Sequence, residues 1–195
     1  MKTNFTSLVA IAVLLFSSTG TAQVPPQKTS GVYVSADDYK NGRLSFEGDC
    51  GSKAHKLELH DVLHKTYIHV THEAEKRRFA KSDLFGFRAC DGHDYRFASN
   101  LEHQILEARG LYIYAREVYV SHGRGRHTVR GYFFSAGAEG AVLALSRENL
   151  KKAFPVNQRF HDAIDVAFGA KQKLSGYDES QKMFKVNQLL IASRE

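Results

Sequence analysis

The chain has 195 residues, of which 43% are hydrophobic and 25% are charged, and its formal net charge at pH 7 is +6. This apolar content excludes wholesale disorder, and the length is close to that of one domain with a sizeable core. A mildly basic chain favours anionic partners without identifying one.

The first 22 residues predict a cleavable secretory signal. Lys2 gives a basic start, residues 8–16 are uninterruptedly apolar, and residues 20–22 (Gly-Thr-Ala) offer a small-residue cleavage site. The apolar run is shorter than the roughly 20 residues that cross a bilayer. No cysteine follows where a lipoprotein would be acylated. We therefore expect a secreted or periplasmic protein of 173 residues and net charge +5, with no transmembrane segment after cleavage.

Cys50 and Cys90 are the only cysteines. Two cysteines in an exported chain predict one disulfide bond. Both lie beside turn residues, where two strand ends can meet. The alternative is a metal or redox pair, which the absence of a C-x-x-C motif disfavours.

Residues 23–30 are polar and contain two prolines, which predicts a flexible lead-in to a single domain over residues 31–195. Ser35 predicts the N-cap of a short helix over residues 36–40, with acidic residues in its first turn and Gly42 after its end.

Residues 31–145 are predicted to be β-rich. Apolar and polar residues alternate around Leu57, Ile68 and Phe87, and aromatic and β-branched runs cover residues 111–120 and 129–134. Turn residues recur about every ten positions, which predicts an antiparallel β-meander, either open or barrel-like.

Residues 146–195 change to a helical period. Ser146 and Asn157 are N-cap candidates for helices over residues 147–154 and 158–168, and residues 178–192 carry a third apolar stripe. Strands followed by C-terminal helices predict the α+β class.

Four stretches, at residues 31–45, 81–97, 147–165 and 183–190, resemble uncharacterised secreted proteins of Bacteroidetes-type bacteria. They include GVYVSADDYKNGRLS and KSDLFGFRACDGHDYRF. The resemblance implies an exported bacterial protein. It implies no activity and no functional residue.

Two basic segments are candidate binding sites, one at a predicted hairpin tip and one at a predicted turn. Guanidinium and ammonium groups there suit carboxylates, sulfates and phosphates, and the two tips form one cationic rim if they lie at the same end of the sheet. The expected partners are an anionic glycan, a lipid headgroup or an envelope protein, with nucleic acid disfavoured. The alternative is that these charges are only solvated. The candidate residues are Arg124, Arg126 and Arg130 at the tip and Lys76, Arg77 and Arg78 at the turn.

Histidines offer a metal-binding alternative. His122 and His127 flank the predicted tip and would face each other across two strands, although a proper site needs a third ligand. Four more histidines lie at positions 60, 64, 69 and 72. If residues 67–72 form a strand, His69 and His72 point to opposite faces, so we expect solvated side chains there and not a metal site.

Catalytic motifs are absent from the sequence: it has no G-x-S-x-G, no H-E-x-x-H and no nucleotide-binding glycine loop. A pair of catalytic carboxylates leaves no mark in a sequence. The sequence therefore favours a non-catalytic binding or envelope-associated module without a cofactor. A metal-binding protein and a small secreted hydrolase are the alternatives.

Overall fold

The computed structural model describes residues 28–60, 65–122, 125–169 and 173–194, so the predicted signal segment 1–22 lies outside the described residues. The elements in chain order are β1 (Thr29–Tyr33), α1 (Ala36–Lys40), β2 (Ser45–Asp49), β3 (Lys56–Glu58), β4 (Tyr67–His72), β5 (Glu75–Ala80), the 3-10 helix η2 (Lys81–Asp83), β6 (Gly86–Arg88), β7 (Asp94–Ala98), β8 (Leu101–Arg109), β9 (Leu111–His122), β10 (Gly125–Ser135), β11 (Leu143–Ala144), α2 (Arg147–Ala153), α3 (Gln158–Ala167), β12 (Tyr177–Asp178), β13 (Met183–Phe184) and α4 (Lys185–Ala192).

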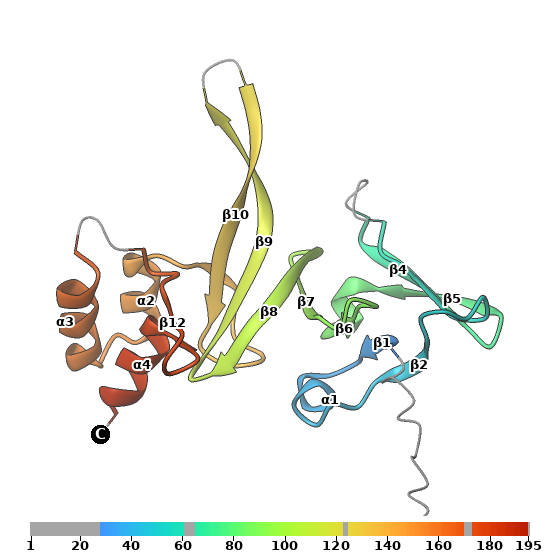
Figure 1. The fold of residues 1–195 in the computed structure, drawn as a ribbon, viewed down its shortest axis with the longest axis horizontal. Coiled ribbons are helices and arrows are strands. Elements are labelled where there is room, and N and C mark those ends of the chain that lie inside the picture. Colours follow the sequence, from blue (N-terminus) through green and yellow to red (C-terminus); the bar gives the residue numbers. More distant parts are fainter. Residues whose placement is uncertain (1–27, 61–64, 123–124, 170–172, 195) are drawn as a thin grey trace, which may run out of the picture.

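The largest element in the described part of the chain is an eight-stranded sheet in the order β11-β10-β9-β8-β7-β6-β1-β2. Strands β6 to β11 form a meander of consecutive antiparallel neighbours, and β1 lies between β6 and β2. The outer strands β11 and β2 do not pair with each other, so the sheet in the described residues is open and is not a closed barrel (Figure 1). The predicted α+β class is confirmed.

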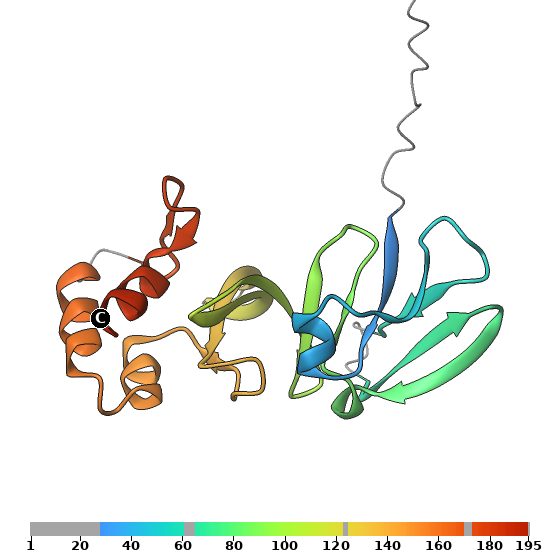
Figure 2. The ribbon, with the colours of Figure 1, turned by 90° about the horizontal axis from the view of Figure 1, so that it is seen from below.

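The C-terminal helices pack against one face of the β9–β10 hairpin (Figure 2). Leu111 and Ile113 on β9 contact a buried cluster that includes Leu150 on α2 and Ile164 on α3. The predicted N-cap of α3 is present, since the Asn157 side chain accepts a hydrogen bond from the third helical residue at 3.0 Å. Among the described residues, no helix has the length and apolar character needed to cross a membrane.

The segment over residues 178–192 differs from its predicted apolar stripe. Its first part forms the β12–β13 hairpin, and α4 begins only at Lys185. The buried carboxylate of Glu107 explains the break, because it accepts a hydrogen bond from the backbone N–H of Phe184 at 2.8 Å. Asn187 on α4 donates to the same carboxylate at 2.9 Å and accepts from the N–H of Leu111 at 2.8 Å. These polar contacts dock the end of the chain onto the sheet.

The three-stranded sheet β3-β4-β5 packs on the other half of the molecule (Figure 1). Ile68 and Val70 on β4 are fully or almost fully buried against Val32, Phe87 and Phe97 of the large sheet. Since strand side chains alternate between faces, burying this inner face leaves the opposite face of β4 to solvent.

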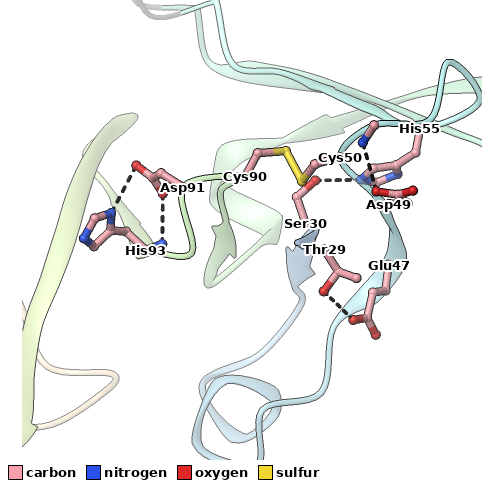
Figure 3. The surroundings of a disulfide bond; sticks show 10 residues. Thr29, Ser30, Glu47, Asp49, Cys50, His55, Cys90, Asp91 and His93 are labelled. Carbon is pink, nitrogen blue, oxygen red and sulfur yellow. Dashed lines mark hydrogen bonds and ion pairs between the residues drawn. A yellow bond between two sulfur atoms is a disulfide. The ribbon is translucent and has the colours of Figure 1, made fainter. Parts of the chain in front are cut away.

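The predicted Cys50–Cys90 disulfide is present, with the two Cα atoms 5.7 Å apart (Figure 3). Cys50 follows β2 and Cys90 follows β6, so the bond closes a loop that contains all of β3, β4 and β5. Beside it, the hydroxyl of Ser30 lies 2.7 Å from Nε2 of His55. Ser30 is 1% exposed and belongs to β1, which begins at Thr29. The predicted lead-in therefore extends too far, because β1 is already paired to β2 at residues 29 and 30.

Candidate binding surface on the three-stranded sheet

The solvent-facing side of the three-stranded sheet gathers basic, imidazole and aromatic side chains. The strand register sets the rows across it: Glu58 pairs with His69 and His69 pairs with Arg78, while Lys56 pairs with Thr71 and Thr71 with Lys76. We name this surface the β4 face and define it by Lys56, Glu58, His60, Lys65, Tyr67, His69, Lys76 and Arg78.

Glu58 is the one carboxylate among these eight residues, and it is bracketed by cations. Its Oε2 accepts from Lys76 Nζ at 2.6 Å and its Oε1 lies 3.1 Å from Lys56 Nζ. Hydrogen bonds from both lysines lower the pKa of Glu58 to about 2, so the carboxylate stays charged at any physiological pH. Both lysine side chains are more than half exposed, so these ion pairs add little stability.

Two imidazoles meet beside that carboxylate. His60 Nε2 lies 2.9 Å from His69 Nδ1, and Glu58 Oε2 lies 3.8 Å from the same His69 nitrogen. Burial, followed by the positive charge of Lys76, lowers the pKa of His69, which favours a neutral ring at pH 7. One ligand atom from each of the three residues lies within 4.8 Å of the others. This donor set, two imidazoles and a carboxylate, is one that zinc and similar metals use.

Tyr67 forms the aromatic centre of the β4 face. Lys65 Nζ lies 5.4 Å from the centroid of its ring and the Arg78 guanidinium 5.2 Å. The rings of His60 and His69 contact it edge-on at 5.5 Å and 5.3 Å between centroids. The ring thus positions two cations and two imidazoles on one surface.

Backbone conformations that favour glycine shape both ends of this sheet. His60 has φ +58°, where the chain turns after β3. Glu73 and Ala74 have φ +51° and +65° and connect β4 directly to β5, with His72 paired to Glu75. Two consecutive positive φ values are those of the tight hairpin turn that matches strand twist.

The predicted basic turn at Lys76, Arg77 and Arg78 is wrong in its local structure, because all three lie in β5. Lys76 and Arg78 are on the β4 face. Arg77 is on the opposite side of the strand, where it pairs with Glu75 at 2.6 Å and lies over the ring of Phe46.

The β9–β10 hairpin carries the other predicted residues. Arg124 lies outside the described residues, and the backbone of Arg126 pairs with Ser121. Arg130 is exposed, donates to Gln104 Oε1 at 3.2 Å and lies 5.9 Å from the ring of Tyr132.

Strand pairing also fixes the two hairpin histidines. The register pairs His122 with Gly125 and His127 with Val120, so the two are diagonal neighbours and not directly opposite. Figure 1 places the free end of this hairpin on a different part of the molecule from β5, so the described basic residues do not form one continuous rim.

The grouping of Glu58, His60 and His69 was missed by the sequence interpretation. The available signal was the spacing Glu58-x-His60, because residues two apart share a face of an extended segment, although β3 ends at Glu58 and His60 lies in the turn that follows. Its third member comes from the neighbouring strand, and only the pairing of β3 with β4 reveals it.

In comparisons with known proteins, no protein-family model, no curated protein and no solved structure matches the chain.

Proposed function

We propose that this is an exported, non-catalytic binding protein whose β4 face binds an acidic polysaccharide. The observation that carries the proposal is the concentration of charge on one sheet face, where four basic side chains accompany a single carboxylate: Lys56, Lys65, Lys76, Arg78 and Glu58.

The arrangement of the cations supports an extended ligand. The cations come from the two outer strands, β3 and β5, and from the segment before β4. Neighbouring strands lie about 4.8 Å apart, and same-face neighbours along a strand lie about 7 Å apart. A linear glycan with an acid group on each sugar can contact several such points at once, whereas one phosphate group cannot.

Two of the cations form no ion pair with a carboxylate among the described residues. Lys65 and Arg78 rest on the Tyr67 ring, which orients them while leaving their charge available to a ligand. A purely structural role for β5, namely that its charges block pairing at the sheet edge, requires no such grouping on one face.

Export is part of the proposal. Residues 1–22 support it through their signal-like pattern, as does the resemblance to secreted bacterial proteins, and a disulfide is compatible with an oxidising compartment. N-terminal sequencing of the protein recovered from outside the cytoplasm should begin at Gln23, and an intact Met1 there would contradict the signal assignment.

Retention of the mature protein on immobilised polygalacturonate in a salt gradient tests the binding surface. The double variant Lys76→Gln/Arg78→Gln removes two charges from the β4 face and should weaken binding roughly 2- to 30-fold, at about 0.2–1 kcal/mol for each exposed charge contact. Arg77→Gln is the control, because it removes one charge from the same strand on the other side, and it is matched in charge to each of the single variants Lys76→Gln and Arg78→Gln.

The expected result is earlier elution of the double variant and elution of Arg77→Gln close to wild type. An equal loss per charge removed in Arg77→Gln and in the double variant would mean that only net charge matters, which would contradict a specific face. Loss confined to Arg130→Gln would move the site to the β9–β10 hairpin. Binding to anionic phospholipid vesicles but not to the polyuronate would replace the glycan with a lipid headgroup.

A further inference from the structure

We infer that Glu58, His60 and His69 form a binding site for a divalent transition-metal ion, best matched by Zn²⁺. This inference stands on the local geometry and does not depend on polysaccharide binding.

The distances are close to those that coordination requires. Zn²⁺ held at about 2.0–2.1 Å by each of two tetrahedral ligands separates the ligand atoms by about 3.3 Å. His60 Nε2 and His69 Nδ1 are 2.9 Å apart, and Glu58 Oε2 is 3.8 Å from His69 Nδ1. These two separations therefore need to change by only about half an ångström to accept a common ion. The ligand atoms of all three residues lie within 4.8 Å of one another.

Proton positions are compatible with loading. His60 Nε2 and His69 Nδ1 share one hydrogen bond, so one of these two nitrogens carries a proton. That proton must move to the other nitrogen of the same ring before the lone pairs of both nitrogens can bind a metal. This change of tautomer takes place by proton exchange with water and leaves the net charge of the ring unaltered. The Glu58 carboxylate is already ionised.

Competition from lysine is the main cost of binding. Lys76 occupies Glu58 Oε2 at 2.6 Å, and a metal ion at that oxygen displaces it. The Lys76 side chain is 51% exposed and can move into water, so the displaced ion pair is of the weak surface kind.

The site has restricted freedom before a metal arrives. His69 is on the central strand, Glu58 is directly opposite it on β3, and the Tyr67 ring contacts both imidazoles. Three protein ligands leave one position of a tetrahedral ion open to water or to an anionic oxygen.

Titration of the mature, untagged protein with Zn²⁺ against a chromogenic chelator, and with Co²⁺ by its visible absorption, tests the site. One equivalent should bind, with the intense absorption of a four-coordinate Co²⁺ centre. His69→Gln and Glu58→Gln should each weaken Zn²⁺ binding at least about 10-fold, the effect already typical of outer-shell partners. His93→Gln is the control, because His93 is an exposed histidine that pairs with Asp91 at 3.1 Å on a different turn.

The most discriminating variant is one that should bind Zn²⁺ more tightly than wild type. Lys76→Gln removes the competing cation and should tighten Zn²⁺ binding roughly 2- to 5-fold, which misfolding cannot produce. The same substitution weakens polyanion binding under the proposed function, so the two proposals predict opposite signs and fail independently. Absence of Zn²⁺ binding, weakening by Lys76→Gln, or loss of binding in His127→Gln instead of His69→Gln would overturn the inference.

Discussion

The Cys50–Cys90 disulfide should make a large, separable contribution to stability. The bond joins residues 40 positions apart, so its removal frees a long loop in the unfolded chain. In the chain-entropy description a loop of this length corresponds to about 4 kcal/mol at 25 °C. For a domain of this size, that loss lowers the melting temperature by about 8–16 °C.

The double variant Cys50→Ala/Cys90→Ala measures this contribution. Urea unfolding followed by circular dichroism should give a free energy of unfolding about 4 kcal/mol below wild type. A reductant should destabilise wild type to a similar extent and leave the variant unchanged. A loss below about 1 kcal/mol would refute the reasoning, because it would mean that the unfolded chain already restrains this loop.

Because the disulfide closes the loop that contains β3, β4 and β5, its loss should also be felt locally. Amide hydrogen exchange in β4 should accelerate more than exchange in β9 under native conditions. Equal acceleration in both strands would contradict a local role for the bond.

Two further predictions concern buried polar groups. Burial lowers the pKa of His103 to about 4, so the unfolded chain takes up a proton below pH 6.5 while the folded protein does not; stability is complete above pH 6.5, and about 3 kcal/mol is lost as pH falls to 4 and below. Urea unfolding of His103→Leu should show a smaller decrease between pH 7 and 4, and an identical decrease would refute this assignment. Asn187→Leu strands the N–H of Leu111 and removes a donor to Glu107, so it should cost about 2–4 kcal/mol in the same assay, whereas a cost below about 0.5 kcal/mol would show that these contacts contribute nothing.

Local signals explain what the sequence predicted correctly. The short helix α1 depends on Ser35, whose hydroxyl accepts from the N–H of Asp38 at 3.1 Å while the Asp38 carboxylate accepts from the N–H of Ser35 at 3.0 Å. Both residues lie within one turn of chain, so this capping box is visible without tertiary information. The disulfide was predictable in the same way, since two cysteines allow only one pairing.

Turn geometry without glycine or asparagine explains one error. The β4–β5 connection uses Glu73 and Ala74 at positive φ, and neither residue type marks such a turn. The turn was predicted at the run of charged residues that follows, so Lys76 was placed in a turn although it is a strand residue.

The long-range register of the strands explains the second error, which is the missed grouping of His60 with His69. His60 and His69 are nine positions apart, and the expected strand alternation separated His69 from His72 correctly. What brings His60 to His69 is the pairing of β3 with β4, with Glu58 opposite His69. Such pairing depends on which inner-face residues the core buries, and one sequence does not reveal it.

The most direct test of the β4 face is an NMR titration of ¹⁵N-labelled protein lacking residues 1–22 with polygalacturonate oligomers. Amide shifts should concentrate in β3, β4 and β5, with His69 and Lys76 among the largest, and should shrink in Lys76→Gln/Arg78→Gln. Shifts confined to the β9–β10 hairpin, or equally spread over α2 and α3, would contradict the β4 face as the binding surface.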